Sequence, residues 1–99
     1  MARFDVYRDP EGHGFLLDIQ ASMMDHLNTR IVVPLMVPSE APKPAKGLNP
    51  EFNIGGVVVV MITQFLAAVP ISALKDQVAT LDHHHSTIVD AVDLLLQGF

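Results

Sequence analysis

Three consecutive histidines, His83 to His85, are the most conspicuous side chains in this chain that could do chemistry. Imidazole nitrogens are common zinc ligands, which raises the question of a metal site. Successive residues on a helix point about 100° apart, so three in a row cannot converge on one ion. His13 or His26 could add a ligand, but no spacing fixes that geometry. A solvated helix start is favoured over a metal site, and we expect no cofactor.

Carboxylates are the next candidates, because a pair of them can act as general acid and base. The aspartates considered are Asp18, Asp25, Asp90 and Asp93. Only the last two are brought together by spacing, on one face of a helix, where surface solubility is the simpler interpretation. The sequence has no cysteine nucleophile, phosphate-binding glycine loop or Gly-x-Ser-x-Gly elbow. The residues give no positive case for catalysis, and we expect a protein that is not an enzyme.

The charge balance is acidic, since 6 Lys and Arg stand against 11 Asp and Glu and give a net charge of −5. The basic residues are scattered, which disfavours direct binding to nucleic-acid phosphates. The lack of cysteine fits a reducing compartment, and the N-terminus has no apolar signal-peptide segment. The longest apolar run, Val57 to Ile62, is far shorter than the roughly 20 residues of a membrane-spanning helix. We expect a soluble cytoplasmic protein without membrane contact.

The elements that must position any site are mostly strands. Phe4 to Tyr7 alternates apolar and polar residues, and Phe15 to Ile19 resumes that character after a Gly- and Pro-rich loop, which predicts a hairpin. The β-branched segment Thr29 to Val33 predicts a strand closed by Pro34. Between them, Ser22 to Asn28 reads as a polar turn.

A second hairpin is predicted by Phe52 to Ile54, the pair Gly55-Gly56 and the strand Val57 to Thr63. Because its apolar run has no polar face, we expect that second strand to be central and covered on both sides. Val69 to Ile71 reads as a short edge strand around a proline. The segment before this hairpin, from Pro38 to Pro50, contains four prolines and predicts a mobile surface loop.

The chain ends in an amphipathic helix that begins near Asp82, a plausible N-cap, and breaks at Gly98. Its polar positions are Ser86, Asp90, Asp93 and Gln97, and its apolar positions are Ile88, Val92, Leu95 and Leu96. About five strands and one terminal helix predict a mostly-β fold, a barrel or an α+β plan, in one domain over residues 1–99.

Two segments are candidates for contact surfaces, with packing into the core as the alternative for each. Met23 and Met24 lie in the polar turn, and methionine is over-used where one surface must accept a partner. Phe99 leaves an aromatic ring at the chain end, either tucked back onto the barrel or inserted into something else.

Several segments in register resemble the CcdB family of plasmid-type toxins. They are Leu17 to Gln20 with Ser22 to Asp25, Asn28 to Leu35, Ala68 to Ser72, and the ending Ile88 to Phe99. Order and spacing are kept over almost the whole chain, with residues 36 to 56 as the weak part.

The resemblance implies an SH3-like barrel of the CcdB/MazF kind that acts as a homodimer in a type II toxin–antitoxin module for plasmid maintenance. It implies a topoisomerase poison, a DNA gyrase inhibitor that binds the A subunit of DNA gyrase and traps the DNA-cleaved complex. It also implies a CcdA-like antitoxin partner. Carried over by position, the gyrase-binding residues are Met23, Met24, Asp93, Leu96, Gln97, Gly98 and Phe99.

Three positions depart from the best-known member of the family, which has Trp at the position of Gln97, Asn at Asp93 and Ile at Phe99. Loss of the indole removes a large stacking surface of the kind that dominates many interfaces. Two alternatives stay open. One is an endoribonuclease toxin of the MazF type, because that family is similar in fold, although the acidic charge balance disfavours it. The other is a family member that binds antitoxin without being toxic.

Overall fold

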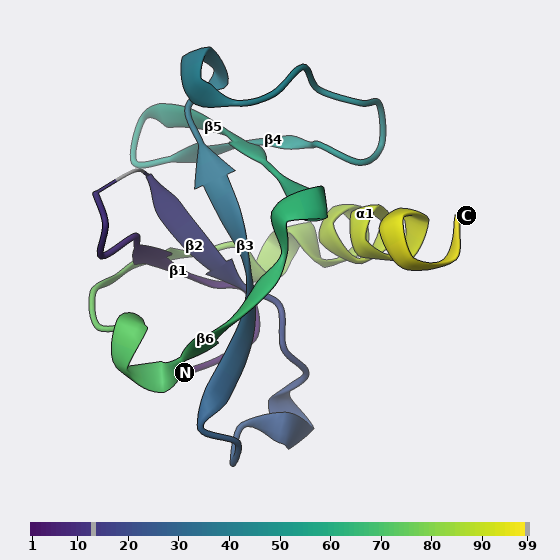
Figure 1. Ribbon diagram of the computed structural model, residues 1–99. Coiled ribbons are helices and arrows are strands. Elements are labelled where there is room, and N and C mark those ends of the chain that lie inside the picture. The colour runs from purple at the N-terminus through teal and green to yellow at the C-terminus, as the bar shows by residue number, and fades with distance from the viewer. Residues whose placement is uncertain (13, 99) are drawn as a thin grey trace.

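The computed structural model in Figure 1 describes residues 1–12 and 14–98. Over those residues the chain forms a seven-stranded antiparallel sheet and one α-helix, α1, at its C-terminal end. The strands are β1 (Asp5–Arg8), β2 (Phe15–Asp18), β3 (Thr29–Met36), β4 (Glu51–Ile54), β5 (Val57–Met61), β6 (Ala67–Pro70) and β7 (Gln77–Thr80), and α1 spans His85–Gln97. The predicted mostly-β fold with one terminal helix is confirmed.

β3 organises the sheet because it is the longest strand and has three neighbours. The strand order is β4-β5-β3-β2-β1-β7, and β6 also pairs with β3. One edge of β3 pairs with β2, whereas its other edge pairs first with β6 over Thr29–Val32 and then with β5 at Leu35 and Met36. The sheet therefore curls, and Figure 1 shows β5 and β6 leaving β3 at its two ends.

Pro34 does not close the third strand, as the sequence had predicted, but lies inside it opposite Leu16. The N–H and C=O of one strand residue face the same neighbour, and the Pro34 carbonyl accepts a hydrogen bond from Ile62 N at 2.9 Å. Its missing donor therefore faces the gap in which β3 changes partner from β6 to β5. A proline is tolerated where the ladder requires no N–H.

The core lies between the curled sheet and the first turns of α1. Val6, Leu17, Val33, Val59 and Ile88 are completely buried within it. The helix contributes Ile88 and Ala91 to the core, whereas residues 92–95 are half-buried and Leu96 and Gln97 are exposed. Burial of such side chains is the main stabilising contribution to a small domain.

The prediction that the Val57–Ile62 run is covered on both sides is right for its last four residues alone. From Val59 to Ile62 every residue is fully buried, but Val57 and Val58 are 43% and 45% exposed. The β4–β5 hairpin extends beyond the neighbouring strand, so its tip has no cover. The predicted glycine turn at Gly55-Gly56 is confirmed.

Two further differences concern the C-terminal third. β7, which pairs with β1, was not predicted, because Gln77–Thr80 carries no run of large apolar residues. Asp82 does not cap α1 but lies in a 3-10 turn over Asp82–His84, and the helix begins at His85 without a side-chain cap. Gly98 ends the helix as predicted, in a left-handed conformation.

Candidate functional site

The end of α1 presents a large apolar side chain to solvent. Leu96 is 67% exposed, Gln97 and Gly98 are exposed, and Asp93 is half-buried. Gly98 N donates to Leu94 O at 3.0 Å and closes the last turn of the helix. Phe99 lies outside the described residues, so its predicted role has no structural description. We call residues 96–99 the C-terminal tail.

The second predicted contact surface lies between β2 and β3. Ser22–Met24 forms a short 3-10 helix, η1, and residues 21–29 are exposed throughout. Met23 is 79% exposed and Met24 is 44% exposed. We call residues 21–28 the methionine turn. Its apolar side chains face solvent instead of the core, which is what a contact surface requires.

These two surfaces do not form one patch within a single chain. Figure 1 shows the methionine turn beyond the ends of β2 and β3, well apart from the tip of α1. A partner that touched both surfaces of one chain would have to span this separation. In a symmetric homodimer each surface would occur twice, giving four contact points.

A buried polar network underlies the methionine turn, and the sequence analysis did not identify it. Arg30 Nε donates to Asp18 Oδ2 at 2.9 Å, and Arg30 Nη2 lies 2.8 Å from the same oxygen, with both side chains withdrawn from solvent. Arg30 Nη1 is buried with no hydrogen-bond partner among the described residues. Gln20 N donates to Asp18 Oδ1 at 3.0 Å. The available signal was the polar residues Asp18, Gln20 and Arg30 in otherwise apolar strands.

Burial governs the protonation of this network. Loss of hydration raises the pKa of Asp18, because burial outweighs the hydrogen bond from Gln20 and the attraction of Arg30. Burial also raises the pKa of Tyr7, and the nearby carboxylates of Asp5 and Asp18 add to that shift. Since Arg30 is closed off inside this network, its guanidinium is not available to an external phosphate.

The histidine run spans the end of the 3-10 turn and the first residue of α1, and His84 and His85 pack against aromatic residues. The His84 ring lies 5.0 Å from that of Phe52, and the His85 ring meets Phe4 edge-on at 5.3 Å. His83 remains exposed, with its Nδ1 at 3.6 Å from Asp82. Within residues 1–12 and 14–98, no three His, Asp or Glu side chains lie where they could hold a metal ion.

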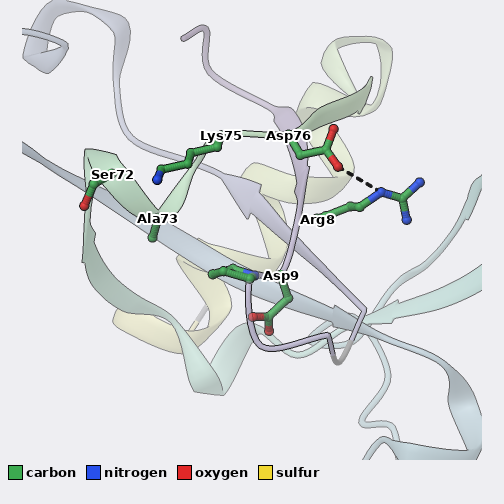
Figure 2. Close-up of a pocket in the computed structure, with 7 residues that line it drawn as sticks. Arg8, Asp9, Ser72, Ala73, Lys75 and Asp76 are labelled. Carbon is green, nitrogen blue, oxygen red and sulfur yellow. Dashed lines mark ion pairs between the residues drawn. The ribbon is translucent and has the colours of Figure 1, made fainter.

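A hollow of about 320 Å³ lies at the start of β7 and holds the other group of polar side chains. Figure 2 shows Arg8 paired with Asp76, while Lys75 and Ser72 lie along another part of its wall. The Arg8–Asp76 ion pair measures 3.0 Å and is well exposed. Asp9 also lines the hollow. The positive charges of Arg8 and Lys75 are therefore balanced by the negative charges of Asp9 and Asp76.

Solved structures share this fold. An endoribonuclease from Mycobacterial species superposes with a TM-score of 0.75 at 14% identity, covering 97% of this chain and 90% of that chain. An endoribonuclease in complex with its cognate antitoxin, also from Mycobacterial species, has a TM-score of 0.78 at 15% identity, covering 97% and 94%. The curled sheet with one terminal helix is thus a fold that this chain shares with both endoribonucleases.

Within that fold class, the sequence identifies the family of the chain. The family model described as CcdB protein matches residues 3–98, and the chain belongs to the CcdB family of toxin–antitoxin toxins. The resemblance seen in four short segments is confirmed over nearly the whole length. No helix among the described residues is both long and apolar enough to cross a membrane.

Proposed function

We propose that this CcdB family member is a gyrase poison, a cytoplasmic homodimer that binds the A subunit of DNA gyrase and traps the DNA-cleaved complex. The observation that carries the proposal is the exposure of Leu96 at the end of α1, with Met23 and Met24 exposed on the methionine turn. Large apolar side chains left in water mark contact surfaces when they cluster at defined elements. Binding of gyrase would bury them.

The mechanism is selective affinity and needs no chemistry from the toxin. A ligand shifts a conformational equilibrium only by binding one state better than the other. The toxin would bind gyrase with cleaved, open DNA more tightly than gyrase with intact DNA, and would thereby hold the enzyme in the cleaved state. Asp93, Gln97, Gly98 and Phe99 complete the proposed contact, as the family resemblance implies.

The apolar surface of the helix supports the homodimer. Leu94 and Leu95 are half-buried, and Phe65, on the neighbouring short helix η3 (Thr63–Phe65), is 51% exposed. These side chains belong to neighbouring elements, because α1 and η3 contact each other, and we propose that they form one dimer face. A second copy of the chain would cover that face and bring two C-terminal tails to one partner.

An antitoxin is the second proposed partner. One structural relative was solved with its cognate antitoxin, and this chain shares its fold over 97% of its length. This chain carries a net charge of −5. We therefore expect the toxin-binding segment of the antitoxin to carry basic residues, because opposite charges speed the association of two proteins. The antitoxin would neutralise the toxin by competing for it with gyrase.

Truncation tests the gyrase contact directly. Deletion of residues 97–99 and the substitution Leu96→Ala should each abolish toxicity and gyrase binding, while circular dichroism and antitoxin binding stay unchanged. Val58→Ala is the matched control, because it removes an exposed apolar side chain from the distant hairpin tip. Expression in cells with a toxin-resistant gyrase allele should restore growth. Full toxicity after the truncation would refute the contact.

RNA cleavage is the second candidate function, and one group of residues favours it. The hollow of Figure 2 brings Arg8, Lys75 and Ser72 to one surface, and cationic groups beside a phosphate are what cleavage requires. Both structural relatives are endoribonucleases. Incubation of the purified protein with mRNA, without gyrase, separates the two candidates. Specific cleavage that Arg8→Ala and Lys75→Ala abolish would favour the nuclease.

A further inference from the structure

Gln20 makes more hydrogen bonds through its side chain than its place at the end of a strand would require. Its Nε2 donates to Met24 O at 2.8 Å and to Thr29 O at 3.1 Å, and its Oε1 accepts from Ile31 N at 2.9 Å. The residue is only 8% exposed. One carboxamide thus joins the middle of the methionine turn to the start of β3.

We propose that Gln20 is a positioning residue, whose carboxamide fixes the shape in which the methionine turn presents Met23 and Met24. The inference rests on the proposed function of that turn as a partner contact. Gln20 does not itself need to touch the partner, since its side chain is buried beneath the turn.

The turn has little else to hold it. None of the residues of η1 is buried, so packing into the core cannot fix it. Inside the turn, Met24 N donates to Ala21 O at 2.9 Å, Asp25 N to Ser22 O at 3.2 Å and Leu27 N to Met24 O at 3.3 Å, all of them local bonds. Apart from the Gln20 contacts, Asn28 O accepts from Ile71 N at 3.1 Å and ties down the far end. The centre of the turn is therefore fixed by the carboxamide.

The Gln20 carboxamide with its three hydrogen bonds, which we call the clamp, is itself anchored in the core. Gln20 N donates to Asp18 Oδ1, and the other oxygen of that carboxylate binds Arg30. Ile19 N donates to Ile31 O at 3.0 Å and continues the pairing of β2 with β3 up to the turn. Since Asp18, Ile19, Gln20 and Arg30 are all buried, the backbone from which the Gln20 side chain starts is held by the core.

The chemistry of the clamp requires a carboxamide, because two donors and one acceptor must lie on one planar group. Glutamate keeps the size and the acceptor but loses both donors, and it sets a carboxylate against two carbonyl oxygens. Methionine keeps the length and loses all three bonds. The two substitutions therefore separate the contact to Ile31 N from the contacts to Met24 O and Thr29 O.

Amide hydrogen exchange on the full chain tests the clamp, at a temperature well below unfolding. In Gln20→Met, the amides of Met24, Leu27 and Ile31 should exchange about tenfold faster, equivalent to roughly 1.4 kcal/mol of opening free energy. In Gln20→Glu, the Ile31 amide should stay protected while the turn amides become faster. Both variants should bind gyrase, through its A subunit, about tenfold more weakly.

Val59→Ala is the control, since it destabilises the core on β5 without touching the turn. It should leave turn exchange and gyrase binding at wild-type values even with an equal or larger loss of stability. The inference is overturned if Gln20→Met leaves turn exchange unchanged, or loosens the turn without weakening binding. A wild-type chain that fails to bind gyrase would instead refute the proposed function. The exchange measurements would still test the hydrogen bonds of Gln20, because they do not involve gyrase.

Discussion

The carboxylate of Asp18 and the guanidinium of Arg30 form an ion pair sealed inside the protein, with Arg30 Nε at 2.9 Å from Asp18 Oδ2. The exposed fractions of the two side chains are 0% and 1%. Two charges removed from water are tolerated because each neutralises the other. Removing one of them leaves a buried charge alone.

The first prediction follows from that pairing. Asp18→Asn and Arg30→Met should each lower the free energy of unfolding by about 3–5 kcal/mol, because each leaves a buried group without its partner. Urea unfolding at neutral pH measures the loss. The double variant Asp18→Leu with Arg30→Met should lose less than the sum of the single losses. A loss below about 1 kcal/mol in both single variants would show that the pair contributes little.

The second prediction concerns Tyr7, whose pKa is raised from 10.0 by burial and by the carboxylates of Asp5 and Asp18. A folded-state pKa above the unfolded value means that the folded chain holds this proton more tightly. The stabilising contribution is then complete below pH 10.0 and is lost as pH rises through the folded-state pKa. Urea unfolding across this alkaline range should show falling stability, and Tyr7→Phe should reduce the slope.

The composition makes that titration easy to follow. Tyr7 is the only tyrosine and the chain has no tryptophan, so the ultraviolet absorbance of tyrosinate reports this one side chain. In the folded protein the midpoint should lie above 10.0, and in urea it should return to the ordinary tyrosine range. A midpoint near the ordinary value, with circular dichroism still that of the folded chain, would contradict the prediction.

The third prediction compares two glycines of the β1–β2 loop. A Cβ at Gly14 would lie 2.4 Å from the carbonyl oxygen of Leu35, whereas one at Gly12 would meet no atom within 4 Å. Both have positive φ, at 103° and 80°, so alanine is strained at either place. Gly14→Ala should cost about 1–3 kcal/mol more than Gly12→Ala, because it also pushes β2 from β3. Thermal unfolding measures the difference, and equal midpoint temperatures for Gly14→Ala and Gly12→Ala would contradict the prediction.

Local patterns in the sequence were sufficient to predict the hairpins and the terminal helix. The glycine pair at Gly55-Gly56 is a short-range signal that describes the structure. The alternation in Phe4 to Tyr7 placed a strand within one residue of β1, but Phe4 to Tyr7 are all buried, so the predicted polar face is absent. Pro34 and Asp82 were misread because their roles depend on distant parts of the chain. The proline is accommodated by the change of partner along β3, and the helix begins where His84 and His85 pack on Phe52 and Phe4.

The site was predicted in part. The polar surroundings of Met23 and Met24 indicated exposure, and the exposure is confirmed, although their contact with gyrase stays a prediction. The network under them was missed, because Asp18 and Arg30 are twelve positions apart and only strand pairing brings them together. No local spacing rule connects residues of different strands, so a buried ion pair of this kind follows from the register.

The last prediction separates the two ends of the apolar face of α1. Ile88 is fully buried in the core and Leu96 is 67% exposed, although the sequence pattern placed both on one stripe. Ile88→Ala should therefore lower the free energy of unfolding by about 2–5 kcal/mol through the cavity it leaves. Leu96→Ala should change it by less than about 0.5 kcal/mol, as expected for a surface position. Urea unfolding of the dilute protein, where any dimer is dissociated, measures both. A Leu96→Ala loss as large as that of Ile88→Ala would mean that the C-terminal tail is part of the core, and that this end of the helix is not free to bind a partner.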